Sequence, residues 1–183
     1  MKMLRLATTN AHKLREFREI LEPLGYAVLG TEDIPDFDVI EDGETFADNA
    51  IKKAAALCAI SGAPAIADDS GLEVDALNGA PGVHSARYAG VDGSERDAAN
   101  RRKLLDAMAK TPQDKRRARF VCTIALCSPD RAPLTFRGEL NGSIALQERG
   151  SGGFGYDSIV LVNHGHRTVA ELSSEEKNKI SHR

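Results

Sequence analysis

An apolar run that leads into adjacent acids constrains this chain more than any other stretch. Residues 63–67 are apolar, with one proline among them, and Asp68, Asp69, Ser70 and Gly71 follow directly. The pattern predicts a buried strand that ends in acids and turns at the glycine. Ligands bind at the carboxyl edge of the sheet in α/β folds, and carboxylates there hold hard cations. Because Asp, Ser and Gly are also ordinary turn residues, a solvated turn without a ligand is the alternative.

Short apolar runs alternate with segments of helical periodicity along the rest of the chain, which predicts an α/β fold. Further strands are expected at residues 4–8, 26–30, 120–128, 134–140 and 158–162. Helices are expected at residues 11–24, 46–61, 94–108 and 175–183. Thr45 and Ser94 are the expected caps of the second and third helices, and Ser173 caps the last. Asn141 and Gly142 predict a turn or bulge after the strand at 134–140.

The length of 183 residues suits one domain, or two small lobes that share one sheet. The formal net charge of −3 argues against a dedicated nucleic-acid-binding or membrane-surface protein, because such proteins carry a basic excess. No apolar run reaches the length that a bilayer-spanning helix needs. The apolar run at the amino terminus is too short for a signal peptide.

Cysteines and histidines give no sign of a metal site. Cys58, Cys122 and Cys127 form no C-x-x-C pair, and the odd spacing of the last two makes them face opposite sides of one strand. We interpret all three as buried, reduced thiols of a cytosolic protein. His164 and His166 fall in an expected turn and have no partner at ligand spacing.

The first expected helix begins where a phosphate could bind. Thr8, Thr9 and Asn10 follow the first strand and cap the helix that starts at Ala11. Backbone N–H groups and the helix dipole favour anions at such an end, and Lys13 adds a full positive charge. The stretch therefore predicts a phosphate cradle, with a purely structural helix start as the alternative.

Two other stretches offer groups for the same kind of site. Asn49 and Lys53 lie four residues apart and share one face of their helix, although such a pair is often simply exposed. The acidic loop of residues 31–43 is mostly expected to be solvated. One or two of its acids could reach a metal if the loop folded back over Asp69.

A glycine-rich segment near the end of the chain suggests contact with a ligand. Residues 150–155 contain four glycines around Phe154. Glycine lets backbone approach a ligand closely, and an aromatic ring there can stack on a base. A flexible hairpin loop is the alternative.

Six stretches together resemble one protein family, and they occur in the family's order along the whole chain. They are ATTNAHKLREF, DGETFADNAIKKA, IADDSGLEVDALNGAPGVHSARYAG, RARFVCTIAL, GGFGYDSI and TVAELSSEEKNKISHR. The chain is similar to the inosine triphosphate / xanthosine triphosphate pyrophosphatases, which hydrolyse non-standard purine nucleoside triphosphates. The central stretch and the terminal EKNKISHR are the specific matches.

The resemblance implies a fold and an activity. The implied fold is α/β, an elongated mixed β-sheet bent between two lobes, with flanking helices and the active site in the inter-lobe cleft. The whole chain, residues 1–183, would form one such domain. The implied reaction cleaves ITP, dITP or XTP to the monophosphate and pyrophosphate with Mg²⁺, in a cytoplasmic homodimer that binds neither nucleic acid nor membrane.

The same resemblance implies roles for individual residues. The phosphates would be held by Lys53 and by the stretch Thr8, Thr9, Asn10, Ala11, His12 and Lys13. Glu41 and Asp69 would bind Mg²⁺, Asp69 would also be the base for the attacking water, and Ser70 would contact the substrate. The base pocket would comprise Phe154, Gly155, Tyr156, Asp157, Lys177, His182 and Arg183.

The chain departs from the family pattern at three places. Asp48 stands where members usually carry Glu, Ser158 stands where they carry Pro, and members continue beyond Arg183 into a final helix. Two other functions therefore stay open beside the implied one. The first is a house-cleaning pyrophosphatase for another modified nucleotide, which the base-pocket residues would decide. The second is a nucleotide-binding module that has lost catalysis.

Overall fold

The computed structural model describes residues 2–162 and 165–183, so the turn predicted at His164 lies outside the described residues. The described residues form a seven-stranded sheet in the order β2-β1-β3-β4-β5-β6-β7. The sheet is mixed, because β1 pairs in parallel with β2 and β3 whereas β6 pairs antiparallel with β5 and β7. Its strands are β1 (Lys2–Leu6), β2 (Tyr26–Leu29), β3 (Ala65–Val74), β4 (Arg117–Cys127), β5 (Leu134–Ile144), β6 (Val160–Val162) and β7 (Arg167–Thr168). The α-helices are α1 (Ala11–Leu21), α2 (Phe46–Ser61), α3 (Arg96–Ala107) and α4 (Ser174–Ile180).

The chain divides into two compact units whose boundaries fall inside β3, β4 and β5. Unit 1 comprises Met1–Asp69 and Cys122–Arg137, and unit 2 comprises Ser70–Val121 and Gly138–Arg183. Within residues 2–162 and 165–183, no helix is both long and apolar enough to cross a membrane.

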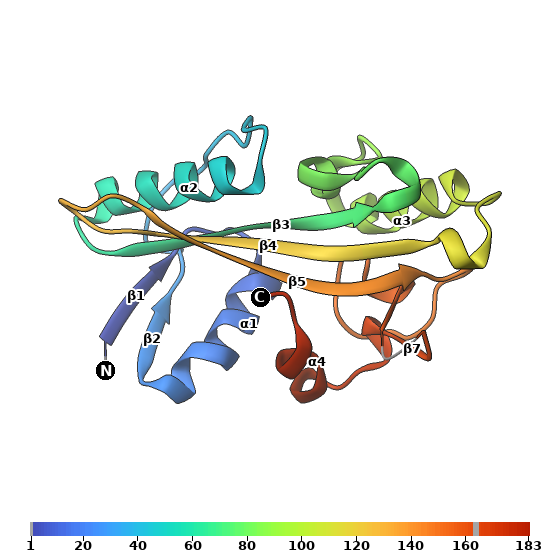
Figure 1. Ribbon diagram of the computed structural model, residues 1–183. Coiled ribbons are helices and arrows are strands. Elements are labelled where there is room, and N and C mark those ends of the chain that lie inside the picture. The colour runs from blue at the N-terminus through green and yellow to red at the C-terminus, as the bar shows by residue number, and fades with distance from the viewer. Residues whose placement is uncertain (1, 163–164) are drawn as a thin grey trace. The chain divides into compact units, whose positions relative to one another are not determined.

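In unit 1, α1 and α2 cover opposite faces of the strands (Figure 1). The alternation of side chains along β3 explains this arrangement, since successive residues of a strand point to opposite faces. Ala65 and Ala67 pack with the small side chains of α2, and Ile66 packs with Leu14 and Phe17 of α1. The small residues on the α2 side let the helix approach the sheet closely.

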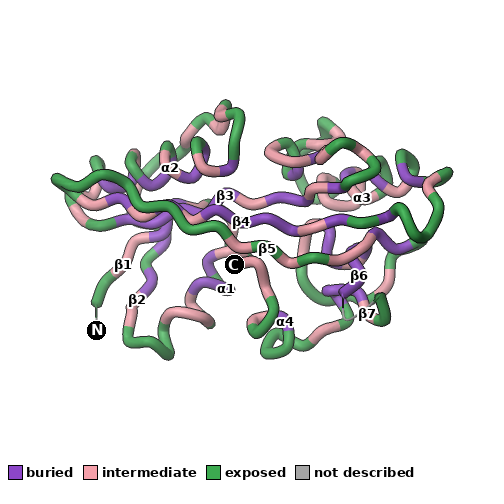
Figure 2. Tube along the Cα trace, viewed as in Figure 1, coloured by how far each residue is buried: buried purple, intermediate pink, exposed green. Residues whose placement is uncertain are grey.

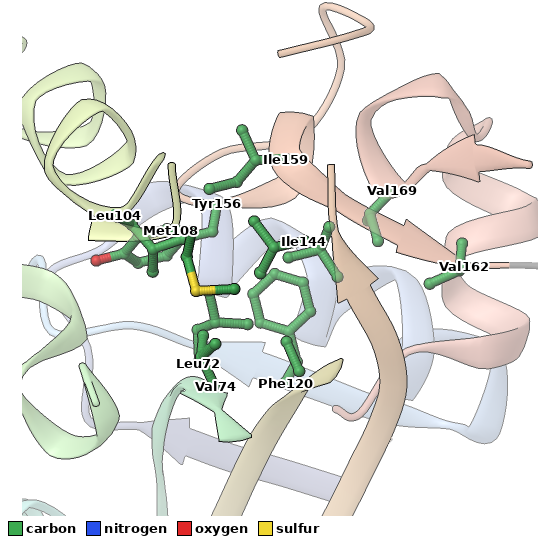
Figure 3. Packing of buried hydrophobic residues seen from close by; sticks show 12 residues of the cluster. Leu72, Val74, Leu104, Met108, Phe120, Ile144, Tyr156, Ile159, Val162 and Val169 are labelled. Carbon is green, nitrogen blue, oxygen red and sulfur yellow. The ribbon is translucent and has the colours of Figure 1, made fainter. Parts of the chain in front are cut away.

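Unit 2 has its own core on the other half of the long strands. Figure 3 shows how α3, the three long strands and the segment after the glycine-rich loop contribute to it. Its fully or nearly fully buried members include Leu72, Val74, Leu104, Met108, Phe120, Ile144, Tyr156, Ile159 and Val160. Burial of this apolar area is the main favourable term for folding of the unit.

The acidic stretch is not the turn that its composition predicts. β3 runs without a break from Ala65 to Val74 and carries Asp68, Asp69, Ser70 and Gly71 inside it. Figure 2 shows β3 buried along most of its length. Because β1 pairs with the start of β3 at Ala65 and Ile66 and β4 flanks β3 on its other side, sheet pairing overrides the local turn preference. The two acids therefore lie in the middle of a strand.

Two smaller predictions also need correction. Asn141 and Gly142 lie inside β5, which continues to Ile144. A Cβ at Gly142 would lie 2.3 Å from the carbonyl oxygen of Leu161, so the glycine serves the close approach of β6 rather than a turn. Ser94 is not the cap of α3, because it lies within a 3₁₀ turn, Gly93–Glu95, that runs directly into the helix.

Most element predictions are confirmed by the structure. Helix α2 has the expected bounds, with Thr45 as its N-cap and Gly62 in the left-handed conformation as its C-cap. Ser173 and Glu176 form the expected capping box of α4. That helix ends earlier than predicted, at Ile180, and leaves the last three residues extended or coiled.

Candidate active site

Asp68 and Asp69 point to opposite faces of the sheet in unit 1. This follows from the strand period, and it means that each acid meets a different helix. Asp69 lies on the face of α2, where it contacts Asn49 and Lys53. Asp68 lies on the face of α1, where it contacts Lys13. Both acids are buried, with 2 % of Asp68 and 5 % of Asp69 exposed.

The ammonium group of Lys53 joins three oxygen atoms on the α2 face. Its Nζ donates to Oε1 of Glu41 at 2.8 Å, to the backbone oxygen of Asp68 at 2.9 Å and to Oδ1 of Asp69 at 3.2 Å. Glu41 comes from the acidic loop, so one of its acids does reach the neighbourhood of Asp69. Other acids of the loop pair with cations at the surface: Glu32 with Arg18, Asp33 with Arg5 and Asp42 with Lys52.

Burial and charge set the protonation of this cluster. Burial raises the pKa of Asp69 and the charge of Glu41 adds to the effect; Lys53, Lys13 and the Asn49 hydrogen bond oppose it without cancelling it. Burial by itself would lower the pKa of Lys53, but the charges of Asp69 and Glu41 outweigh it and raise that pKa. The lysine is therefore charged at neutral pH, and Asp69 is a better proton acceptor than an exposed aspartate.

Asp68 anchors Lys13 on the opposite face. Lys13 Nζ forms an ion pair with Oδ1 of Asp68, and the thiol of Cys122 donates to Oδ2 at 3.0 Å. Cys122 and Cys127 do face opposite sides of β4, since Cys127 packs in the cluster under α2. The three cysteines are free and buried, as predicted.

The stretch before α1 caps the helix and borders a pocket. Asn10 is the N-cap, and its Oδ1 accepts hydrogen bonds from the N–H groups of His12 at 2.9 Å and Lys13 at 3.2 Å. Thr8, Thr9, Asn10 and Ala11 line one side of a pocket of about 450 Å³, and Thr31, Ile34 and Phe37 are among the residues on its other side. Thr9, Ala11 and His12 are exposed. A ligand anion would therefore compete with the Asn10 side chain for two of the helix amides.

In unit 1, Glu41 and Asp69 are the carboxylates that could hold a divalent cation together with substrate phosphates. Glu41, Asp68 and Asp69 are close to two ammonium groups, Lys13 and Lys53, so negative charge exceeds positive charge by one. After burial, the negative charge of Glu41 is the other cause that raises the pKa of Asp69. Within residues 2–162 and 165–183, no group of three or more His, Cys, Asp or Glu side chains is arranged to hold a metal by itself. One or two carboxylates completed by substrate phosphates is the usual arrangement for Mg²⁺.

In unit 2, the segment 154–157 is held by contacts at each residue. Oδ2 of Asp157 accepts from the N–H of Phe154 at 2.9 Å and from Nζ of Lys177 at 2.8 Å. The ammonium of Lys177 lies 5.0 Å from the centre of the Phe154 ring. The Tyr156 side chain is buried in the core, and its hydroxyl donates to the backbone oxygen of Ser85 at 2.8 Å. Of these side chains, Phe154 is the partly exposed one.

The last residues of the chain lie against the same unit. The His182 ring stacks on Phe120, with ring centroids 5.0 Å apart and an interplanar angle of 13°. Nη2 of Arg183 donates to Oγ of Ser70 at 2.9 Å. A Cβ at Gly138 of β5 would lie 2.2 Å from the backbone oxygen of His182. The absence of a side chain at Gly138 is therefore what lets the tail cross the strand.

Comparison with known protein families supports the resemblance: the model of the Ham1 family matches residues 4–183. The chain belongs to the Ham1 family. It is 53% identical to a dITP/XTP pyrophosphatase of Geobacter sulfurreducens, over 100% of this chain and 92% of the relative. It is 48% identical to a dITP/XTP pyrophosphatase of Bacillus licheniformis, over 100% and 93% of the two chains.

Two solved structures confirm the mixed α/β fold with flanking helices. The HAM1 protein of Coxiella burnetii is 44% identical, with a TM-score of 0.88 over 100% of this chain and 93% of that one. The Ham1 protein of Staphylococcus aureus is 46% identical, with a TM-score of 0.85 over 100% and 92%.

Two departures that the Ham1 resemblance exposes have local structural roles. Asp48 completes the capping box of α2, since its Oδ2 accepts from the N–H of Thr45 at 3.2 Å and from its hydroxyl at 2.7 Å. Ser158 donates from Oγ to Oε2 of Glu148 at 3.0 Å. Among the described residues, the hydrogen bonds of these two side chains do not reach Asp69 or Lys53.

The sequence pointed to Asn49 beside Lys53 but assigned it no role in the site. Its side chain is fully buried, its amide nitrogen donates to Oδ2 of Asp69 at 3.1 Å, and its oxygen accepts from the N–H of Gly43 at 2.8 Å. Asn49 thus links Asp69 to the loop that carries Glu41. Its spacing of four residues from Lys53 was the available signal, but the same spacing fits an exposed pair.

Proposed function

We propose that this protein hydrolyses non-standard purine nucleoside triphosphates, ITP, dITP and XTP, to the monophosphate and pyrophosphate. The observation that carries the proposal is the cluster of buried Asp69 and Lys53 with the partly exposed Glu41, in a chain of the Ham1 family. The relatives named dITP/XTP pyrophosphatase support the choice of substrate.

The residues of unit 1 would bind the triphosphate and start the reaction. Lys13, Lys53 and the stretch Thr8 to His12 would neutralise and orient the phosphate oxygens. Asp69 would accept a proton from water as the water oxygen bonds to the α-phosphorus, and the bond to the bridging oxygen would break to release pyrophosphate. Mg²⁺ held by Glu41 and Asp69 would supply charge stabilisation for the phosphates and the leaving group.

The residues of unit 2 would recognise the base. Inosine and xanthosine present a 6-keto oxygen and an N1–H, whereas adenosine presents a 6-amino group and a bare N1. Donors on His182 or Arg183 would match the keto group, and Phe154 would stack on the ring. Adenosine would leave buried donors unpaired, which is a strong basis for rejection. Ser70, Gly155, Tyr156, Asp157 and Lys177 are the remaining residues assigned to the substrate.

Pyrophosphate release from a panel of nucleotides tests the proposal. ITP, dITP and XTP should release pyrophosphate in the presence of Mg²⁺ and stop doing so when EDTA removes the metal. ATP, GTP and dTTP should react far more slowly. Turnover of a modified pyrimidine in place of the keto purines would overturn the substrate assignment. Binding of ITP without turnover would overturn the enzymatic one.

The assembly and location of the protein belong to the same proposal. We expect a homodimer, as the family resemblance implies. We expect a cytoplasmic location, since the three free, buried thiols suit a reducing compartment. Sedimentation of the purified protein measures the oligomeric state.

Replacing Gly138 by alanine tests the role of the tail. The new Cβ would collide with the His182 backbone and displace His182 and Arg183 from unit 2. Loss of one hydrogen bond to the base, worth ~1 kcal/mol, should raise the KM for ITP about fivefold. Thr135→Ala, an exposed position on the same strand, is the control. An unchanged KM in Gly138→Ala would argue against base recognition by the tail.

A further inference from the structure

We infer that Asp97 and Arg101 of α3 are positioning residues that fix the Phe154–Asp157 segment for recognition of the purine base. The inference rests on the proposed function and adds a specificity-determining pair to it. Neither residue belongs to the stretches that point to the site from sequence.

The two side chains hold the same residue of the loop from both sides. The N–H of Gly155 donates to Oδ2 of Asp97 at 2.9 Å, and Nη1 of Arg101 donates to the oxygen of Gly155 at 2.9 Å. Asp97 and Arg101 lie four residues apart and so occupy one face of α3. Gly155 has φ +60°, a left-handed conformation that glycine adopts readily.

The contacts of Asp97 and Arg101 with Gly155, which together form a clamp, are supported by further hydrogen bonds. Nε of Arg101 donates to Oε2 of Glu148 at 2.8 Å, and Oγ of Ser158 donates to the same oxygen at 3.0 Å. Arg101 is well suited to this role because its planar guanidinium serves two acceptors at fixed geometry. Ser158 stands where the family resemblance leads us to expect a proline. In this chain a hydrogen-bonded network therefore restrains a loop that a proline ring would otherwise stiffen.

The other contacts of the loop leave Gly155 to α3. The Asp157 carboxylate accepts hydrogen bonds from Phe154 and Lys177, and the backbone oxygen of Ser85 accepts one from the buried Tyr156. These anchors fix the two ends of the segment, whereas Asp97 and Arg101 fix the peptide groups between them. A side chain that stacks on a base must be held in one orientation before the base arrives, since ordering it on binding costs affinity.

Arg101→Met and Asp97→Ala are the variants that test the pair. Arg101→Met keeps the apolar stem and removes both guanidinium bonds. Each variant should raise the KM for ITP about tenfold, the change that corresponds to ~1.4 kcal/mol, and leave kcat within about twofold of wild type. Asp97→Asn keeps an oxygen acceptor for Gly155 and should recover most of the affinity. Arg102→Gln, at an exposed position of the same helix, is the matched control.

Hydrogen exchange of the Gly155 amide is the second readout, and it needs no nucleotide. The amide should exchange faster in Asp97→Ala and Arg101→Met than in wild type and Arg102→Gln, while the core amides of β4 stay protected. Unchanged exchange in both variants, or a fall in kcat with no change in KM, would overturn the inference. If wild type releases no pyrophosphate from ITP, the proposed function fails, and the exchange data still decide whether the clamp exists.

Discussion

Asp69→Asn is expected to lower the rate of pyrophosphate release from ITP by roughly 10²–10⁴-fold, the usual cost of losing a general base. The amide cannot accept a proton, yet it keeps the shape of the side chain and an oxygen that can accept the hydrogen bond from Asn49. The loss should therefore appear in kcat, measured by pyrophosphate release at saturating ITP. Asp114→Asn, at an exposed position, is the control.

The stability of this variant separates catalysis from folding. The pKa of Asp69 is raised in the folded protein, so the folded state binds this proton more tightly than the unfolded chain does. The ionised carboxylate consequently costs stability above the raised pKa, and that cost disappears as the pH falls through it. At neutral pH, the urea concentration at the unfolding midpoint of Asp69→Asn should equal or exceed that of the wild type. Near-normal turnover in a folded Asp69→Asn protein would exclude Asp69 as the base.

Lys53→Met is expected to reduce both stability and activity. The side chains of Lys53 and Asp69 are 10% and 7% exposed, so the substitution leaves a buried carboxylate beside the charge of Glu41. Removing one partner of a buried ion pair typically lowers the free energy of unfolding by ~3 kcal/mol or more. Urea unfolding measures this loss, and pyrophosphate release should fall with it because the phosphates lose a cation.

Lys52, the neighbour of Lys53 in the chain, provides a matched control, and the pH dependence of stability provides a second test. Lys52 is exposed and pairs with Asp42 at the surface, so Lys52→Met should stay close to wild type in both assays. Without Lys53, the pKa of Asp69 rises further, and protonation removes the uncompensated charge. The destabilisation of Lys53→Met should therefore shrink as the pH is lowered from neutral toward the raised pKa of Asp69. Equal stability of the two variants would show that the Lys53 contacts add nothing to the fold.

Local patterns in the sequence were sufficient for most of the elements. The helical spacing of α1 and α2, the cap at Thr45 and the capping box at Ser173 depend on residues within one or two turns of each other. Successive residues of a strand alternate between its faces, so Asp68 and Asp69 face opposite ways, as their contacts with Lys13 and Lys53 show. These features need no knowledge of distant residues.

The predictions that failed are those in which distant backbone overrides local preference. Asp68, Asp69, Ser70 and Gly71 have turn propensity, but β3 continues through them in a sheet where β4 is its neighbour and β1 pairs with its start at Ala65 and Ile66. Asn141 and Gly142 stay in β5 because β6 approaches closely at the glycine. Local propensities amount to about 1 kcal/mol per residue, which several ladder hydrogen bonds and buried side chains exceed.

The sequence by itself determined the family, most of the helices and strands, and the alternation that sets the two aspartates on opposite faces, since each of these depends on motifs or on side-chain periods within one element. The tertiary structure decided that the acidic stretch is the interior of β3 and which partners each aspartate has. It also brought Asn49 to Asp69, Cys122 to Asp68, and Arg183 to Ser70. The physical reason is that sheet pairing and helix packing bring together residues between 20 and 113 positions apart, and no local spacing encodes those contacts.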